Sequence, residues 1–253
     1  MKAFSVFGIS GSGKTTTIEN IIKELKARRY SVGSVKEIHF EAFAIDMKGS
    51  NTDRHRKAGS ELVSARGYYE TDVLFPEKLS ISKIFSFYDQ EYVVLEGVTD
   101  YNLPKMITAH NEKEIEEKID ASVFAISGKI SNYLKEYKGI PVINSMENIK
   151  DLVDLIEDKV YEKLPDFDSK CCSACGYDCR TLGMKILKGE AKREDCILSN
   201  RKIKLKINNK DIEMVPFVQN ILINTVKGIV AELEGYKENA KILIEIGSDD
   251  EKL

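Results

Sequence analysis

A glycine-rich stretch near the start of the chain has the residue types and spacing of a phosphate-binding loop. Residues 8–15 read GISGSGKT and fit the pattern G-x-x-x-x-G-K-S/T. Glycines let the backbone curl so that successive N–H groups converge on phosphate oxygens, and the positive end of a following helix adds to the attraction. We expect Lys14 to reach the β and γ phosphates of a nucleotide. The predicted contact residues are Gly8, Ser10, Gly11, Ser12, Gly13, Lys14, Thr15 and Thr16.

A loop of this kind works with a magnesium ion, which needs oxygen ligands. The Thr15 hydroxyl is one predicted ligand. Glu96 is the other, because it follows the apolar run at 92–95 and would leave the end of a neighbouring strand. We expect Glu96 to hold a magnesium-bound water or to orient an attacking one, so Lys14 and Glu96 are candidate catalytic residues.

A second group of polar side chains follows further along the chain. It contains Lys36, His39, Asp53, Arg54 and His55. Arg54 could neutralise charge that develops on transferred phosphate oxygens, and His55 could bind or position a substrate, so both are candidate catalytic residues. On residue chemistry alone, a solvated loop explains this segment equally well.

All five cysteines fall in the last third of the chain, which in a reducing compartment indicates metal ligation. Cys172, Cys175, Cys179 and Cys196 have the spacing C-x2-C-x3-C-x16-C. Three thiolates in one tight loop with a remote fourth suit a 4Fe-4S cluster, and zinc is the lesser alternative because structural zinc sites usually have two separated C-x-x-C pairs. Cys171 could replace Cys172 as a ligand. Electron transfer, redox sensing, structural support and partner docking all remain open as roles.

The elements that must position these residues alternate between strands and helices. From residue 1 to about 164, β-branched runs alternate with stretches whose apolar residues recur at helical spacing. The fold class is therefore α/β: a P-loop NTPase-type, mostly parallel sheet with flanking helices. The predicted strands are 2–7, 31–35, 92–95, 121–126 and 141–143, and the predicted helices are 14–29 and 148–164.

A proline and several polar residues at 164–170 interrupt this pattern and indicate a boundary between domains. We expect a P-loop nucleotide-binding domain over residues 1–165, GTP being the nucleotide that the family resemblance described below implies, and a small α+β iron-sulfur domain over 171–253. The elements predicted in the second domain are a helix at 180–187, a hairpin between 203 and 214, a helix at 216–233 and a strand at 241–246.

The overall composition excludes some classes of partner. The formal net charge of -3 gives no sign of binding to nucleic acid or to an anionic membrane surface. No apolar run approaches the length that spans a bilayer, and the N-terminal residues lack the regions of a signal peptide. We expect a cytoplasmic protein with neither nucleic acid nor membrane among its partners.

Several separated motifs together resemble the molybdopterin-guanine dinucleotide biosynthesis protein B family, MobB. They are the loop at 8–16, K-x-x-H at 36–39, GSNTDRHRKAG at 49–59, LEG at 95–97 and PK at 104–105. The resemblance implies a homodimer that binds GTP and hydrolyses it weakly. It also implies assistance to the guanylyltransferase that joins GMP to molybdopterin, giving the dinucleotide form of the molybdenum or tungsten cofactor. The cysteine pattern is similar to the four-cysteine iron-sulfur domain of corrinoid iron-sulfur proteins, with one residue fewer between its second and third cysteines.

The resemblance also assigns roles and partners. Lys14, Thr15 and Glu96 take the nucleotide and magnesium roles. The residues that line the catalytic or cofactor face are Lys36, His39, Asp53, Arg54 and His55. The implied partners are GTP and molybdopterin or its guanylyltransferase. A molybdenum or tungsten iron-sulfur enzyme that would receive the cofactor is a further hypothesis, which the cysteine cluster suggests.

Two departures from the family pattern bear on activity. Asn51 stands where the pattern has an aspartate, which removes a possible metal ligand or base. No N-K-x-D guanine-reading motif is present, and SGK at 127–129 is a poor substitute, so the preference for GTP over ATP rests on the resemblance. The alternative functions are a P-loop kinase or metal-insertion GTPase for another cofactor, and an iron-sulfur redox or scaffold protein switched by nucleotide.

Overall fold

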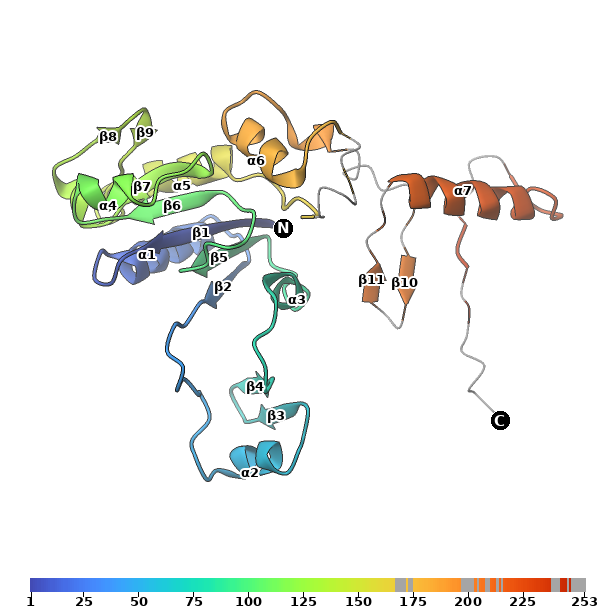
Figure 1. Cartoon of the computed structure of the whole chain (residues 1–253). Coiled ribbons are helices and arrows are strands. Elements are labelled where there is room, and N and C mark those ends of the chain that lie inside the picture. Colours follow the sequence, from blue (N-terminus) through green and yellow to red (C-terminus); the bar gives the residue numbers. More distant parts are fainter. Residues whose placement is uncertain are drawn as a thin grey trace.

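The computed structural model describes most of the chain (Figure 1). The described residues are 1–166, 172, 175–196, 203, 205–207, 210–212, 214, 216–237, 242–244 and 246. Cys171 and residues 208–209 of the expected hairpin lie outside them. Of the strand expected at 241–246, the described positions belong to no strand.

Five parallel strands form the central sheet in the order β2-β5-β1-β6-β7. They are β1 (Lys2–Gly8), β2 (Val32–Lys36), β5 (Tyr92–Glu96), β6 (Lys105–Thr108) and β7 (Val123–Ser127). The expected α/β fold with a parallel sheet is confirmed, but β6 was not predicted. The strand expected at 141–143 is reduced to β9 (Ile140–Pro141), which pairs with β8 (Glu136–Tyr137), and to a parallel bridge between Val142 and Ile126.

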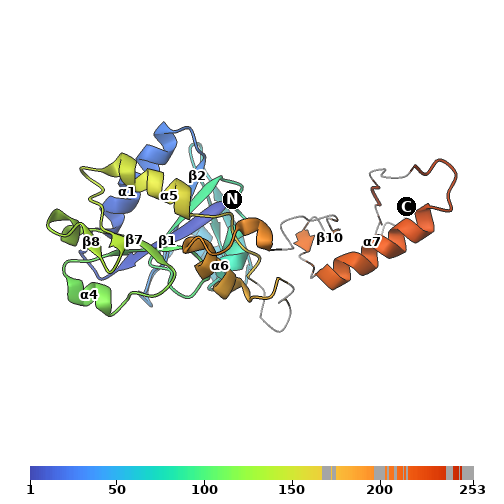
Figure 2. The same cartoon turned by 90° about the horizontal axis from the view of Figure 1, so that it is seen from above.

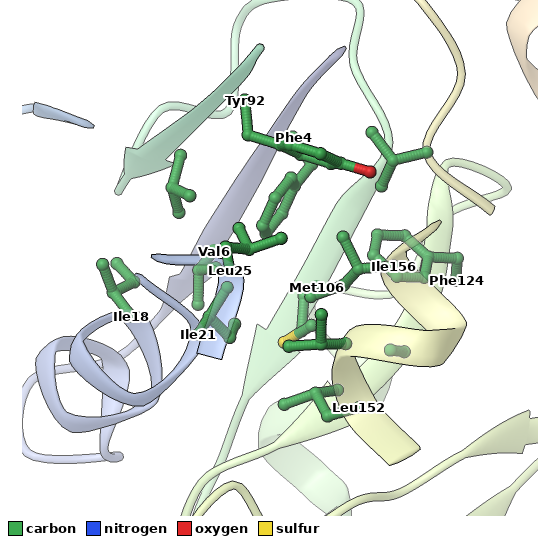
Figure 3. Close-up of a cluster of buried hydrophobic side chains, with 14 residues drawn as sticks. Phe4, Val6, Ile18, Ile21, Leu25, Tyr92, Met106, Phe124, Leu152 and Ile156 are labelled. Atoms are coloured by element: carbon green, nitrogen blue, oxygen red, sulfur yellow. The ribbon is translucent and has the colours of Figure 1, made fainter. Parts of the chain in front are cut away.

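Successive residues of each strand point to opposite sides of the sheet. Both faces are therefore apolar, and helices pack on each of them. Phe4 and Val6 of β1 face α1 (Lys14–Ala27) and α5 (Ile149–Lys159), which lie side by side in Figure 2. Figure 3 shows this core, in which Phe4 and Met106 meet aliphatic side chains of both helices. Ala3 and Phe7 face the other side, which α3 (Ile81–Phe85) and α4 (Glu112–Glu116) cover.

Two further groups of elements lie outside the sheet. The first contains α2 (Asn51–Lys57) and the antiparallel hairpin of β3 (Val63–Arg66) and β4 (Thr71–Leu74). In Figure 1 this group lies away from the sheet at the end of a long connection from β2. The second group follows α5 and contains α6 (Cys179–Leu187), the hairpin of β10 (Leu205–Ile207) and β11 (Lys210–Ile212), and α7 (Pro216–Val230).

The segment after α5 connects α6 to the sheet. Tyr161 and Leu164 are buried against Leu182 of α6. The Arg193 guanidinium, in the short 3-10 helix η2 (Arg193–Asp195), donates hydrogen bonds to the carbonyl oxygens of Glu162 and Lys163 at 2.7 and 3.1 Å. None of the helices that the structure describes is long and apolar enough to cross a membrane.

Candidate functional site

The predicted phosphate-binding loop connects β1 to α1. Gly8, Gly11 and Gly13 all have positive φ, and Gly13, at φ 105°, is the residue that begins α1 without a side-chain cap. A residue with a Cβ rarely adopts that conformation, so glycine is needed where the chain turns into the helix. The N–H groups of the first helical turn have no partner within the helix and face the loop. The loop is therefore curled at a helix start, as phosphate binding requires.

The Lys14 ammonium lies directly over this loop. Its Nζ donates hydrogen bonds to the carbonyl oxygens of Gly8 and Ile9 at 3.0 and 2.6 Å. Burial lowers the pKa of Lys14, Glu96 opposes this shift, and neighbouring lysines lower the pKa further. An anionic ligand would stabilise the charged form, because it adds negative charge beside this partly buried ammonium.

Glu96 lies at the carboxyl end of β5, between β1 and β2. The sheet register pairs it with Val6 on one side and Lys36 on the other. Its Oε1 accepts a hydrogen bond from the Thr15 hydroxyl at 3.1 Å and lies 3.0 Å from Lys36 Nζ. The hydroxyl and the carboxylate are thus close enough to serve one hard cation, and both are the oxygen donors that Mg²⁺ prefers.

The underside of the loop contacts the end of β6 and the segment that follows β7. The buried Ser12 hydroxyl bonds to Thr108 Oγ1 and to the Ile9 carbonyl, both at 2.8 Å. The Ser12 carbonyl accepts a hydrogen bond from the Lys129 N–H at 3.1 Å. A Cβ on Gly128 would lie 2.3 Å from that same carbonyl, so only glycine fits there. Ser12 therefore holds the loop in place from below.

A cleft of about 760 Å³ opens above the loop. Its lining includes most of the predicted contact residues, with Lys36 and His39 from the β2 side. Residues outside the predicted set also line it, among them Glu37, Thr99, Lys118 and Lys129. The complete lining is Phe7, Gly8, Ser10, Gly11, Gly13, Lys14, Thr15, Thr16, Lys36, Glu37, His39, Glu96, Gly97, Thr99, Lys118 and Lys129.

The charges of the cleft suit a polyphosphate with a divalent cation. Four lysines line it, and the hydroxyl–carboxylate pair of Thr15 and Glu96 lies among them. Lys118 comes from beyond α4, and Lys129 begins the 3-10 helix η1 (Lys129–Asn132). Neither carries a local sequence signal for phosphate contact, because sheet order alone brings them to the loop. Lys129 belongs to the SGK stretch that fits the guanine-reading pattern poorly.

The other predicted residues of the polar segment lie elsewhere. Asp53, Arg54 and His55 all belong to α2, and none of the three lines the cleft. Asp53 is buried, and its carboxylate accepts hydrogen bonds from Lys57 Nζ at 2.6 Å and from the Gly49 N–H at 2.7 Å. These two bonds hold the pKa of Asp53 below its usual value. In this chain Asp53 stabilises the start of α2.

The cysteines with metal-ligand spacing lie together near the start of β1, whereas the phosphate-binding loop follows its end. Cys172, Cys175, Cys179 and Cys196 all belong to one packed cluster with Tyr161, Leu164 and Leu182. Cys179 is the first residue of α6, whose N-cap Asp178 accepts a hydrogen bond from the Thr181 N–H at 2.7 Å. Among the described residues, however, no three His, Cys, Asp or Glu side chains come close enough to hold one metal ion.

Comparison with known proteins identifies relatives of the chain. Residues 3–129 match the family model described as molybdopterin guanine dinucleotide synthesis protein B. A Methanocaldococcus jannaschii protein, described as a candidate molybdopterin-guanine dinucleotide biosynthesis adapter protein, is 29% identical over 97% of both chains. The molybdopterin-guanine dinucleotide biosynthesis adapter protein of Haemophilus influenzae is 29% identical over 59% of this chain and 85% of its own.

A solved structure supports the fold. The crystal structure of Bacillus subtilis MobB superposes with a TM-score of 0.53 at 19% identity, and it matches 64% of this chain and 100% of that chain. At this identity the likeness establishes only the fold. The matched share is close in length to the sheet and its flanking helices, and the M. jannaschii relative also covers the cysteine-bearing part.

Proposed function

The chain belongs to the molybdopterin guanine dinucleotide synthesis protein B family, and we propose that it binds GTP with Mg²⁺ and acts as an adapter in the synthesis of molybdopterin guanine dinucleotide. The observation that carries the proposal is the curled loop at the start of α1, with Lys14 above it and the Thr15–Glu96 pair beside it. The names of the M. jannaschii and H. influenzae relatives support the adapter role.

Each part of the cleft has a separate task in this proposal. The N–H groups of the loop and of the first turn of α1 receive the phosphate oxygens, and Lys14 neutralises the terminal phosphates. Thr15 and Glu96 would hold Mg²⁺, which when bound screens the negative charge of the phosphates. Lys36, Lys118 and Lys129 raise the positive potential around them.

Hydrolysis by this set of residues is expected to be slow. Glu96 can orient a water molecule, but its carboxylate is already engaged by the Thr15 hydroxyl and by Lys36. Arg54, the predicted source of positive charge for a transition state, lies in α2 outside the cleft lining. Binding and presentation of GTP to a partner enzyme are therefore the favoured activity.

The direct test is nucleotide affinity measured with a fluorescent GTP analogue in Mg²⁺. Lys14→Ala should weaken binding roughly tenfold or more, because it removes a hydrogen bond between charged groups. Lys26→Ala is the matched control, since Lys26 is in the last turn of the same helix. Equal affinities for the two variants and the wild type would contradict the proposal. Competition with ATP measures the preference for guanine.

The adapter role needs its own assay. We expect the protein to raise the rate at which a guanylyltransferase attaches GMP to molybdopterin, measured anaerobically with and without the chain. Lys14→Ala should remove the increase. If the wild type binds GTP but leaves the rate unchanged, the nucleotide site stands and the adapter role does not.

A homodimer is the assembly that the exposed apolar residues support. Between β2 and α2, the side chains of Phe40, Ile45 and Met47 are about 70% exposed or more. At the tip of the β3–β4 hairpin, Tyr68 and Tyr69 are fully exposed. Exposed apolar side chains gathered in this way indicate a contact surface, and a second copy of the chain offers the same surface in return.

The proposed second domain, residues 171–253, would carry a 4Fe-4S cluster. In its favour, Cys172, Cys175, Cys179 and Cys196 share one packed cluster, and the positive end of α6 lies at Cys179. Anaerobic purification followed by iron, sulfide and zinc analysis tests this proposal. We expect close to four iron and four sulfide per chain. Zinc alone would favour a structural site, and the absence of both metals would remove the cluster.

A further inference from the structure

His110 touches the phosphate-binding loop from outside the cleft. It follows β6 by two residues, and its Nε2 lies 3.0 Å from the carbonyl oxygen of Gly11. Its Nδ1 lies 3.2 Å from Glu114 Oε2, and the same carboxylate oxygen accepts the His110 backbone N–H at 2.8 Å. The imidazole is 30% exposed and the Glu114 side chain 16%. The ring is thus clamped between α4 and the loop.

Both neighbours of the imidazole are hydrogen-bond acceptors. A carbonyl oxygen can only accept, and an ionised carboxylate can only accept. The His110 backbone hydrogen bond, together with the contact to the ring, keeps the pKa of Glu114 below its usual value, so this carboxylate is ionised near neutral pH. A neutral imidazole has one N–H, whereas the imidazolium has two. Only protonated His110 can donate to Glu114 and Gly11 together.

The hydrogen bond to the Gly11 carbonyl orients the peptide group that joins Gly11 to Ser12. In a planar trans peptide, the C=O of one residue and the N–H of the next point in opposite directions. When His110 holds the Gly11 carbonyl outward, the Ser12 N–H points into the loop, where it donates a long hydrogen bond to the Ile9 carbonyl (N···O 3.4 Å). That interior is where a phosphate oxygen would be received.

We propose that protonated His110 is a positioning residue for nucleotide binding, which makes the affinity of the loop for polyphosphate fall as pH rises. The proposal rests on the nucleotide site proposed above. Deprotonation removes one of the two ring N–H groups, so the ring loses its hydrogen bond either to the Gly11 carbonyl or to Glu114. Binding that favours the protonated ring must take up a proton, and affinity then decreases across the range where histidine titrates, roughly pH 5 to 8.

The charged and titratable groups around the ring have opposite effects on the stability of the imidazolium. Glu114 of α4 favours the imidazolium. Lys14, Lys118 and Lys129 line the adjacent cleft and oppose it. Tyr133, which follows η1, donates a hydrogen bond from its hydroxyl to the His110 carbonyl. A bound polyphosphate would neutralise these lysines and so remove their opposition to the protonated ring.

The experiment measures the dissociation constant of a fluorescent GTP analogue from pH 5.5 to 8.5. GTP itself titrates in this range, so His110→Gln serves as the reference, since its amide can donate to Gly11 but cannot titrate. The wild type should lose roughly tenfold more affinity across the range than His110→Gln, about the contribution of one hydrogen bond from a charged donor. Identical pH profiles for the two proteins would overturn the proposal.

A second variant keeps the test decisive if His110→Gln fails to fold. Glu114→Gln removes the carboxylate that favours protonation, so the midpoint of the pH profile should move to lower pH. Glu112→Gln, on the exposed side of the first turn of α4, should leave the midpoint unchanged. An unmoved midpoint in Glu114→Gln would also overturn the proposal. If the wild type binds no nucleotide at any pH, the proposed function itself fails, which is a distinguishable outcome.

Discussion

At the residue scale, the site depends on backbone groups that only glycine can bring close together. Gly128 illustrates this, because it follows β7 and presses against the Ser12 carbonyl from beneath the phosphate-binding loop. The charged side chains above the loop can bind phosphate only if this supporting backbone keeps its conformation. A substitution at Gly128 should therefore weaken the proposed nucleotide site without removing any group that would bind phosphate.

Gly128→Ala should destabilise the fold more than an alanine at a similar glycine elsewhere. Gly128 has φ +84° and its Cβ would lie 2.3 Å from Ser12 O, whereas Gly139 has φ +81° and nothing within 4 Å. We expect Gly139→Ala to lose about 1 to 2 kcal/mol of unfolding free energy from backbone strain alone. Gly128→Ala should lose about 2 kcal/mol more. Urea denaturation measures both, and equal losses would show that the close contact relaxes freely.

At the element scale, β6 positions part of the site, although its sequence lacks the pattern of a buried strand. It has four residues, follows Pro104, and begins with a lysine, so it lacks the apolar run by which a buried strand is recognised. Lys105 is nonetheless buried, because its Nζ donates to the Thr99 carbonyl at 3.0 Å and lies 3.6 Å from Asp120 Oδ2. The strand brings Thr108 and His110 to the loop.

Lys105 offers a test of how β6 is held. Lys105→Ala should reduce the free energy of unfolding by about 2 kcal/mol, because it removes a buried aliphatic stem and the hydrogen bond to Thr99. Lys105→Met keeps most of the stem and should lose about 1 kcal/mol less. Thermal and urea denaturation of both variants would check this order. If methionine were as costly as alanine, the charge rather than the packing would stabilise the strand.

The sequence predicted the local part of the site and missed the part that sheet order determines. The loop, α1 and the strand that carries Glu96 follow from glycine spacing and apolar periodicity within short windows. Lys118, Lys129 and His110 reach the loop only because β6 and β7 lie beside β1. Conversely, Asp53, Arg54 and His55 are polar and close together, but the fold places them in α2, outside the cleft.

At the scale of the whole molecule, the sheet and the group formed by α2, β3 and β4 have different surfaces. The sheet is covered by helices on both faces, and its core is closed. The connection at 37–50 instead exposes large apolar side chains in succession. A surface of this kind is costly in water unless another molecule covers it.

We expect this surface to be buried in a homodimer. Phe40→Asp combined with Ile45→Asp should convert the protein to a monomer, because two charges would then lie in an apolar contact. Light scattering coupled to size-exclusion chromatography gives the mass directly. Met146→Asp is the control, since Met146 is equally exposed but precedes α5 at the sheet. A monomeric wild type, or a double variant that stays dimeric, would refute the assignment of this surface.

Strand β1 has a different neighbour at each end. Its first residues pair with the segment that precedes the cysteines, through the Lys163 N–H to the Met1 carbonyl and the bridge between Lys2 and Glu162. Its last residue opens the phosphate-binding loop, roughly 20 Å further along for a strand of this length. Substitutions among the thiols should therefore leave the residues of the proposed phosphate site in place. The cysteine-bearing end and the proposed nucleotide site can then vary independently of each other.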